Sequence, residues 1–306
     1  MASLKSIKSK IISYKKTGTV THAMEAVSAV KMRKGQERAL SGRAYAAAAL
    51  SILERLAGTP DAERHPLVQE QTGKTCFVII TSDKGLAGSL NSAIIRKTES
   101  EIASRGLAKN DVVIIAVGRR GGDFFLNRGY DVRVKYENLS DGIDEAGVRM
   151  VTDKILEWHA TGEIGAAVML YTNFISTFEQ EASVRQIVPI TRETMRQIIA
   201  GIRPARGKYA PESSGEKHPE PAAYTIEPDA DTILKALLPK LLNIAVFHGL
   251  LESKASEHSA RMVAMKSATD KAKEMAQDLT RTFNKVRQAA ITREVSEITS
   301  GIEAMK

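Results

Sequence analysis

Gly73, Lys74 and Thr75 match the last residues of a phosphate-binding P-loop. Such a loop needs a glycine five residues before Gly73, where this chain has Val68, and a helix immediately after it. The residues that follow, 75-TCFVIITS-82, have the apolar, β-branched composition of a buried strand instead. The sequence therefore does not predict a nucleotide at this position.

A second glycine-containing segment, 83-DKGLAGSLN-91, follows that strand and opens a helical segment. Proteins of the α/β class often bind ligands at this point, but the segment lacks the GxGxxG spacing of dinucleotide-binding turns. We favour a tight strand-to-helix connection made possible by the glycines. A dinucleotide-dependent enzyme that uses this turn is the alternative.

Other residue patterns that carry chemistry are missing from the sequence. There is no GxSxG nucleophile motif and no HExxH metal motif, and no pair of carboxylates has a spacing that marks it as catalytic. The single cysteine, Cys76, cannot form an internal disulfide or a cysteine zinc site. We therefore expect no catalytic residue, no cofactor and no metal, which favours a mechanical or adaptor protein over an enzyme.

No membrane-spanning segment or signal peptide is expected either. The most apolar window, 237–251, contains Lys240 and His248 and is too short to cross a bilayer. Residues 1–10 lack the apolar stretch of a signal peptide. We expect a soluble protein that reaches a membrane only through a complex.

The middle of the chain alternates strand patterns with helix patterns, which is typical of an α/β layer with a mostly parallel sheet. Residues 203–223, rich in Pro, Gly and charge, are expected to be a mobile loop. Apolar or extended runs lie at 75–82, 111–118, 131–139, 166–174 and 180–190, the last as an edge strand with Pro189 near its end, and helical runs lie at 90–106 and 143–160.

The residue patterns at both ends of the chain predict very long helices. Residues 4–57 contain no proline and end at Gly58, Thr59 and Pro60. At 1.5 Å per residue this helix would be roughly 80 Å long, against a diameter of about 50 Å for a compact globule of this length, so it should extend beyond the globular part. After Pro239, residues 240–300 predict a second helix of roughly 90 Å.

The C-terminal helix has a coiled-coil seam, since apolar or small residues recur in steps of three and four. Near Ala290 the pattern shifts by one residue, which should change the buried face. The seam residues are Met262, Met265, Thr269, Ala272, Ala276, Leu279, Phe283, Val286 and Ala290, and after the shift Ile291, Val295, Ile298 and Ile302. We predict an antiparallel coiled coil of residues 1–58 with residues 229–306, joined by a Rossmann-like domain at 74–228.

Charge is concentrated at the N-terminus. Residues 1–57 hold eleven Lys and Arg against three acidic residues, so they account for the whole net charge of +8. This favours an acidic partner: nucleic acid, anionic lipid or an acidic protein surface. A nucleic-acid-binding coiled coil is the alternative function, although aromatic residues make up only 5% and do not interleave with the basic ones.

Four segments resemble the gamma subunit of F-type ATP synthase, and the resemblance covers nearly the whole chain in the right order. They are 21-THAMEAVSAVKMRKGQERA-39, 79-IITSDKGLAGSLN-91 and 257-EHSARMVAMKSATDKAKEM-275 with 284-NKVRQAAITREVSEITSG-301. The resemblance implies a non-catalytic rotor shaft. Its coiled coil would stand in a ring of catalytic beta and non-catalytic alpha subunits, and its foot would grip the epsilon subunit and the proton-driven membrane c-ring.

The resemblance also implies which residues make contacts. Lys31, Arg33 and Lys34, beside Met24, would face an acidic lever of the catalytic subunits. Arg287 and Gln288 match a segment that meets a catch loop of a catalytic subunit. Thr292 and Glu294 lie in the segment that follows, and Tyr224 and Glu227 match the foot.

The resemblance suggests a location as well. The chain starts directly with the family's opening helix, which favours a bacterial protein bound peripherally at the cytoplasmic face of the inner membrane, with a mature organellar chain as the alternative. With Cys76 as its one cysteine, the chain should lack the paired-cysteine redox switch of some photosynthetic members.

Overall fold

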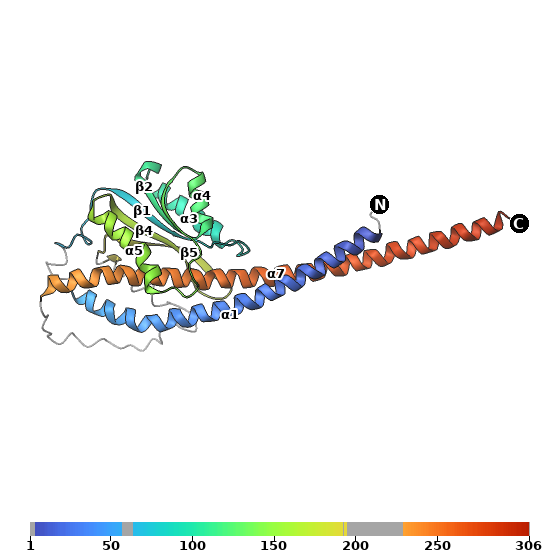
Figure 1. Cartoon of the computed structure of the whole chain (residues 1–306), viewed down its shortest axis with the longest axis horizontal. Helices are drawn as coiled ribbons and strands as arrows, with labels where there is room; N and C mark the ends of the chain where they lie inside the picture. Colours follow the sequence, from blue (N-terminus) through green and yellow to red (C-terminus); the bar gives the residue numbers. More distant parts are fainter. Residues whose placement is uncertain (1–3, 57–63, 192, 195–228, 306) are drawn as a thin grey trace. The chain divides into compact units, whose positions relative to one another are not determined.

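The computed structural model describes residues 4–56, 64–191, 193–194 and 229–305, and for 39–56, 230 and 231 it describes the backbone only (Figure 1). The long terminal helices are present, and the strands and helices of the middle region alternate as expected. The elements are α1 (Leu4–Leu56), β1 (Lys74–Ile80), α3 (Leu90–Ser104), the 3-10 helix η1 (Lys109–Asp111), β2 (Val112–Val117), α4 (Arg119–Asn127), β3 (Asp131–Tyr136), α5 (Glu145–Ala160), β4 (Ile164–Phe174), β5 (Gln180–Val188) and α7 (Ala230–Glu303).

The five strands form one sheet in the order β3-β2-β1-β4-β5. β1 pairs in parallel with β2 and β4, and β2 pairs in parallel with β3. β5 is the edge strand and runs antiparallel to β4. The predicted α/β class with a mostly parallel sheet is confirmed.

Alternate residues of the central strands enter two separate cores. Phe77 and Ile79 of β1 pack with α3 and α4 on one face of the sheet. Cys76, Val78 and Ile80 pack on the other face, against α5 and the first part of α7. Figure 1 shows α5 on the side of the sheet where α7 runs, and α3 and α4 on the opposite side. Both faces of β1, β2 and β4 are therefore buried, which explains their nearly continuous apolar runs.

Helix α4 is not evident in the sequence, because its segment RRGGDFFLN contains two adjacent glycines, which disfavour a helix. The structure supplies the reason for both. A Cβ on Gly121 would lie 3.0 Å from the Thr81 side chain, and one on Gly122 would lie 2.8 Å from Cε of Lys135. The glycines therefore let α4 approach the sheet closely.

The C-terminal helix starts earlier than the run 240–300 that follows Pro239, and its start lies close to the predicted segment boundary at 229. α7 begins at Ala230 and contains Pro239. A proline inside a helix costs about 3 kcal/mol because it lacks the N–H and crowds the preceding turn. Burial of Leu234, Leu238 and Leu241 in the core offsets that cost, since each is at most 1% exposed.

One stretch of the described chain, within Thr232–Glu303, is long and apolar enough to cross a membrane by length and composition. Half of that stretch is buried inside the structure. A buried core helix meets the same criterion, so the stretch is weak evidence for a membrane span.

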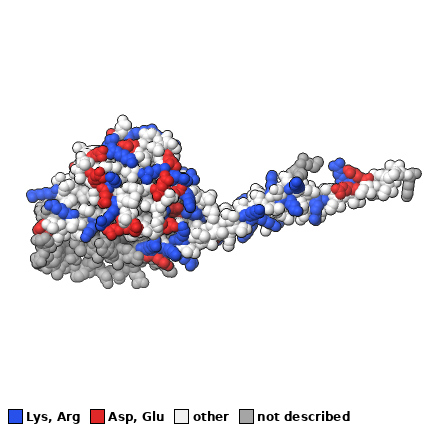
Figure 2. Space-filling view, in the orientation of Figure 1, with Lys and Arg blue, Asp and Glu red and all other residues white. Residues whose placement is uncertain are grey.

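The chain divides into two compact units. The helical unit comprises residues 1–28 and 261–306, and the sheet unit comprises residues 29–260. α1 and α7 contribute to both. The helical unit carries fourteen Lys and Arg against seven Asp and Glu, so almost all of the net charge of +8 lies there. Figure 2 shows Lys and Arg side chains spread along it.

Candidate functional site

The turn after β1 uses its polar groups to hold the carboxyl ends of the strands together. The Asp83 carboxylate accepts hydrogen bonds from the backbone N–H of Arg119 and from that of Asn138, each at 3.0 Å. The Asn91 side chain accepts from the Ser82 N–H at 2.9 Å and donates to the Ser82 hydroxyl at 2.7 Å. These groups join the ends of β1, β2 and β3, so the turn has a structural role.

The ligand crevice of an α/β sheet is filled at the same place by α7. Leu250, Ser253, Lys254 and Glu257 of α7 line the space between the ends of β1 and β2, and a hollow of only about 10 Å³ remains. A single water molecule needs at least about 10–15 Å³. A dinucleotide therefore has no room, and the alternative of a dinucleotide-dependent enzyme loses its site.

The remaining candidate residues for chemistry are structural. Lys74 is the first residue of β1 rather than part of a loop before a helix, so Gly73–Thr75 does not form a P-loop. Cys76 is buried, and burial raises the pKa of its thiol to about 12, which leaves it protonated and unreactive. Within the described part of the chain, no three His, Cys, Asp or Glu side chains lie together as metal ligands.

The helical unit is an antiparallel pair of helices with one shared seam. The Thr21 and Thr269 hydroxyls form a buried hydrogen bond of 2.6 Å, and a Cβ on Gly18 would lie 3.6 Å from Cβ of Ala272. Three residues earlier on α1 thus correspond to three residues later on α7. On α1 the buried positions of this unit are Ile7, Gly18, Thr21 and Ser28, with Leu4, Ile11 and Tyr14 half-buried; on α7 they are Met265, Thr269, Ala272 and Ala276, with Leu279, Phe283, Val286 and Ala290 half-buried.

This seam confirms the antiparallel pairing within the helical unit and the seam residues expected on α7. Ile291, Val295, Ile298 and Ile302, expected to continue it on a shifted face, are each more than half exposed. The register places Leu4, the first described residue of α1, level with Val286. Residues from Ile291 onward therefore lie past the described part of α1, which cannot cover them.

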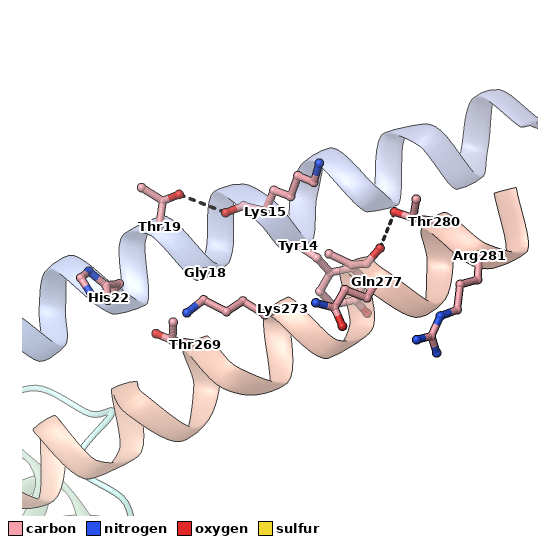
Figure 3. Close-up of a pocket in the computed structure, with 11 residues that line it drawn as sticks. Tyr14, Lys15, Gly18, Thr19, His22, Thr269, Lys273, Gln277, Thr280 and Arg281 are labelled. Carbon is pink, nitrogen blue, oxygen red and sulfur yellow. Dashed lines mark hydrogen bonds between the residues drawn. The ribbon is translucent and has the colours of Figure 1, made fainter. Parts of the chain in front are cut away.

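A groove of about 730 Å³ runs beside the seam, where small residues leave space between the helices (Figure 3). Among the described residues that line it are three cations, Lys15, Lys273 and Arg281, and no acidic side chain. Figure 3 shows the charged ends of Lys15 and Arg281 pointing away from one another, so the positive charge lies on both sides of the pair. This surface suits an acidic partner.

Near the C-terminus, the predicted contact residues Arg287, Gln288, Thr292 and Glu294 are all exposed on α7. At about 100° per residue, Arg287 and Glu294 lie almost in line along the helix, and Gln288 and Thr292 form a second row beside them. The Thr292 hydroxyl donates to the backbone oxygen of Gln288 at 3.0 Å. The four residues thus form two rows that together cover nearly half of the circumference of the helix.

The predicted contact residues of α1 are less uniform. Met24 is half-buried in the helical unit, whereas Lys31, Arg33 and Lys34 are exposed in the sheet unit. Arg33 points away from Lys31, because residues two positions apart in a helix differ by about 200° in direction. Lys31 already forms an ion pair of 2.7 Å with Asp141. The three cations therefore do not form one patch.

Asp141 is a half-buried contact residue between two helices that the sequence does not identify. Its carboxylate contacts Lys31 of α1 at 2.7 Å and His258 of α7 at 3.0 Å, and Lys254 lies 4.0 Å away. Burial works to raise the pKa of the Asp141 carboxyl, but the hydrogen bonds and charges of Lys31 and His258 prevail and lower it to about 2. Its partners Lys31 and His258 lie 110 and 117 residues away in the sequence, so spacing could not have found it.

The foot residues Tyr224 and Glu227, the loop 203–223 and the helix stop at Gly58 to Pro60 lie outside the described residues.

Comparison with known proteins identifies the family. A family model described as ATP synthase matches residues 3–305. The chain is 37% identical over 306 residues to the ATP synthase gamma chain of Heliobacterium modesticaldum and 36% identical over 307 residues to that of Geotalea daltonii, with 100% of both chains covered in each case. The chain belongs to the ATP synthase gamma chain family.

Solved structures agree on the fold. A chain from the mitochondrial ATP synthase of Euglena gracilis, solved with OSCP, F1 and c-ring in rotational state 3, matches with a TM-score of 0.65 at 17% identity, covering 99% of this chain and 94% of the other. A chain from the central stalk and c-ring of the Tetrahymena thermophila mitochondrial enzyme matches with a TM-score of 0.57 at 21% identity, covering 81% and 99%.

As a gamma chain of ATP synthase, the protein is a non-catalytic subunit of a membrane-associated complex, and the expected resemblance is confirmed. These relatives give no support to the alternative of a nucleic-acid-binding coiled coil.

Proposed function

We propose that this gamma chain is the central rotor shaft that couples rotation of a proton-driven membrane c-ring to ATP synthesis and hydrolysis in a surrounding ring of alpha and beta subunits. Its foot, which includes Tyr224 and Glu227, contacts the c-ring and the epsilon subunit. The complex lies at the cytoplasmic face of a bacterial inner membrane, where this chain is peripheral. The paired helices of the helical unit enter the ring.

The observation that carries this proposal is the antiparallel seam of the helical unit, formed by the first and last parts of a chain whose relatives are gamma chains along their full length. The antiparallel pair of helices does not share the rotational symmetry of the proposed ring of alpha and beta subunits, so its sides present different residues to the ring. The groove with Lys15, Lys273 and Arg281 and the exposed row of Arg287 and Glu294 are such distinct sides.

Differences between sides are what a shaft needs. A partner can shift the equilibrium between open and closed catalytic subunits only by binding the two states with different free energies. As the shaft turns, each catalytic subunit meets a cationic side, an apolar side or the row of Arg287, and its preferred state changes accordingly. Rotation thereby becomes release of ATP without any chemistry on the shaft.

Among the contact residues, Arg287 is the sharpest candidate. Its guanidinium is exposed, and it can form two parallel hydrogen bonds with a carboxylate of a catalytic subunit, which lysine cannot reproduce. Gln288, Thr292 and Glu294 complete this contact. Lys34, Arg33 and Met24 contact the acidic lever, and Lys31 does so only when its bond to Asp141 is exchanged for the lever.

The direct experiment is co-expression of the tagged chain with the alpha and beta subunits of its own complex, followed by purification. We expect a stable assembly with ATPase activity. Recovery of the chain with nucleic acid in place of those subunits would refute the proposal.

The Arg287→Ala variant tests the contact. We expect ATP-driven proton pumping by the reconstituted complex to fall by about one to two orders of magnitude, as for loss of a charge-assisted contact worth about 1.5–3 kcal/mol. The folding stability of the chain should be unchanged, because Arg287 is exposed. Lys285→Ala, a nearby exposed cation on another side of α7, is the matched control. Equal pumping by the Arg287→Ala and wild-type complexes would remove the assigned contact.

A further inference from the structure

Strand β4 is longer than its neighbour β1, and the extra part has an unpaired edge. β1 ends at Ile80, and its last partner in β4 is Leu170. From Tyr171 to Phe174, β4 is paired with β5 alone. The backbone groups of alternate residues on the other side of β4, where β1 would have continued, therefore need other partners. A buried backbone N–H or C=O without a partner is strongly destabilising.

Side chains of α7 supply those partners. The Thr172 N–H donates to Oγ of Ser253 at 3.1 Å, and Oγ of Ser256 donates to the Thr172 oxygen at 3.3 Å. The Phe174 N–H donates to Oε2 of Glu252 at 3.3 Å. Helix α7 thus takes the place of the missing strand.

The same row of serines continues into the turn between β4 and β5. Oγ of Ser259 donates to the backbone oxygen of Thr177 at 2.7 Å. Ser253, Ser256 and Ser259 are spaced three residues apart, so they follow one side of the helix. Glu252 and Ser253 are each 6% exposed, and Ser256 and Ser259 are 0% exposed.

Serine at these buried helix positions has no packing advantage. It is a poorer helix former than alanine, because its hydroxyl competes for nearby backbone groups, and alanine would fill almost the same volume. Gly249, one turn earlier, already brings α7 close to β4, since a Cβ there would lie 2.6 Å from Cε of Met169. The serines are explained by the directional bonds that they form with β4.

We propose that Glu252, Ser253, Ser256 and Ser259 form a keyed joint that prevents α7 from turning about its own axis against the sheet. Apolar packing alone is non-directional and permits slip, whereas hydrogen bonds depend on angle and fix the rotation of the helix. Because α7 continues from the sheet unit into the helical unit, this joint passes torque from one unit to the other. The role in torque rests on the proposed rotor function.

The first test is hydrogen exchange of the isolated chain, measured by mass spectrometry on the peptide that covers residues 170–175. In a Ser253→Ala, Ser256→Ala double variant, exchange of this peptide should accelerate by about tenfold or more, as expected when a buried group loses its partner. Peptides from β1 and β2 should be unchanged, and Ser267→Ala, at an exposed serine of α7, should behave as wild type. Unchanged exchange of the 170–175 peptide in the double variant would overturn the proposal.

The second test is coupling in the reconstituted complex, measured as protons pumped per ATP hydrolysed with and without an opposing proton gradient. The joint predicts a loss that grows with the gradient, since the torque on α7 grows with it. A merely structural defect lowers pumping equally at every load, and that result would overturn the joint. If the double variant does not assemble, Ser256→Ala alone is measured in the same two ways.

The two proposals fail differently. If the wild-type complex does not couple pumping to ATP hydrolysis, the rotor function fails, while the exchange measurement still decides whether the serines hold β4. If the wild type couples and the variant couples equally well under load, only the joint fails.

Discussion

Gly18 of α1 faces Ala272 of α7 in the helical unit, and the space between them accepts a methyl group. A Cβ at position 18 would lie 3.6 Å from Cβ of Ala272, an ordinary contact distance. Alanine favours a helix interior over glycine by about 1 kcal/mol. We therefore expect Gly18→Ala to stabilise the helical unit by about that amount, measured as slower hydrogen exchange of peptides from residues 4–28. Faster exchange would mean that the helices approach too closely for alanine.

The carboxylate of Asp141 contacts both α1 and α7, and its loss should lower stability. Asp141→Asn removes an acceptor shared by α1 and α7 and should destabilise the sheet unit by about 1 kcal/mol at neutral pH, an amount that allows for solvent screening of a carboxyl that is 39% exposed. Urea unfolding can be followed by the fluorescence of Trp158, the single tryptophan, which lies in the core.

The pH dependence gives this prediction its sign. The folded-state pKa of Asp141, about 2, lies below the usual value of about 3.9, so its contribution is present above about pH 4 and is lost as the pH falls toward 2. The difference between Asp141→Asn and wild type should therefore shrink over that range. Asp153→Asn, at an exposed position of α5, is the control. A difference that stays constant down to pH 2 would assign the loss to packing instead.

Some candidate residues can be predicted from the sequence, and others become evident only in the folded structure. Arg287 and Gln288 carry a family pattern, and the structure leaves them exposed on α7. Asp141 and the serine row of α7 carry no local signal, because their partners are distant in sequence and meet only in the folded chain. The cationic residues 31, 33 and 34 look like one patch in sequence, but Lys31 is bound to Asp141 and Arg33 points elsewhere.

At the scale of elements, the seam requires small residues on α7. Ala272 is 5% exposed and lies against α1. Ala272→Leu adds three carbon atoms where the space toward Gly18 accepts a single methyl group, and it should destabilise the helical unit by about 1–3 kcal/mol. Hydrogen exchange should then accelerate in peptides from residues 4–28 and 261–290.

The matched control for this variant is Lys266→Leu, which places the same side chain at an exposed position of α7. Exchange in that variant should match the wild type. If Ala272→Leu leaves exchange unchanged, the two helices are not in close contact at this level of the seam.

The elements that the sequence predicts well are those with a strong period. The buried strands and the α7 seam follow from apolar runs and from steps of three and four residues. Helix α4 is hidden because its glycines serve packing against Thr81 and Lys135 rather than local helix propensity. The start of α7 is hidden by Pro239, whose cost is offset by core contacts that no local pattern reports.

In the molecule as a whole, the two units differ in net charge and in their proposed mechanical role. The helical unit holds nearly all of the net positive charge, whereas the sheet unit is close to neutral. Under the proposed rotor function, the charge of the helical unit suits contact with acidic surfaces of surrounding subunits, and the sheet unit adds Arg33 and Lys34 to that contact. The continuous helices α1 and α7 are the covalent connection between them.

In the proposed function, α1 and α7 turn together as one shaft. A Thr21→Cys, Thr269→Cys variant tests it, because the two hydroxyls lie 2.6 Å apart and Cys76 is buried with its thiol pKa raised to about 12, so it does not compete for oxidation. We predict that oxidation links the two helices and that the linked complex still pumps protons on ATP hydrolysis as well as the reduced one. Failure to form the link, or a loss of pumping on oxidation that reduction restores, would contradict a shaft in which the paired helices move as one.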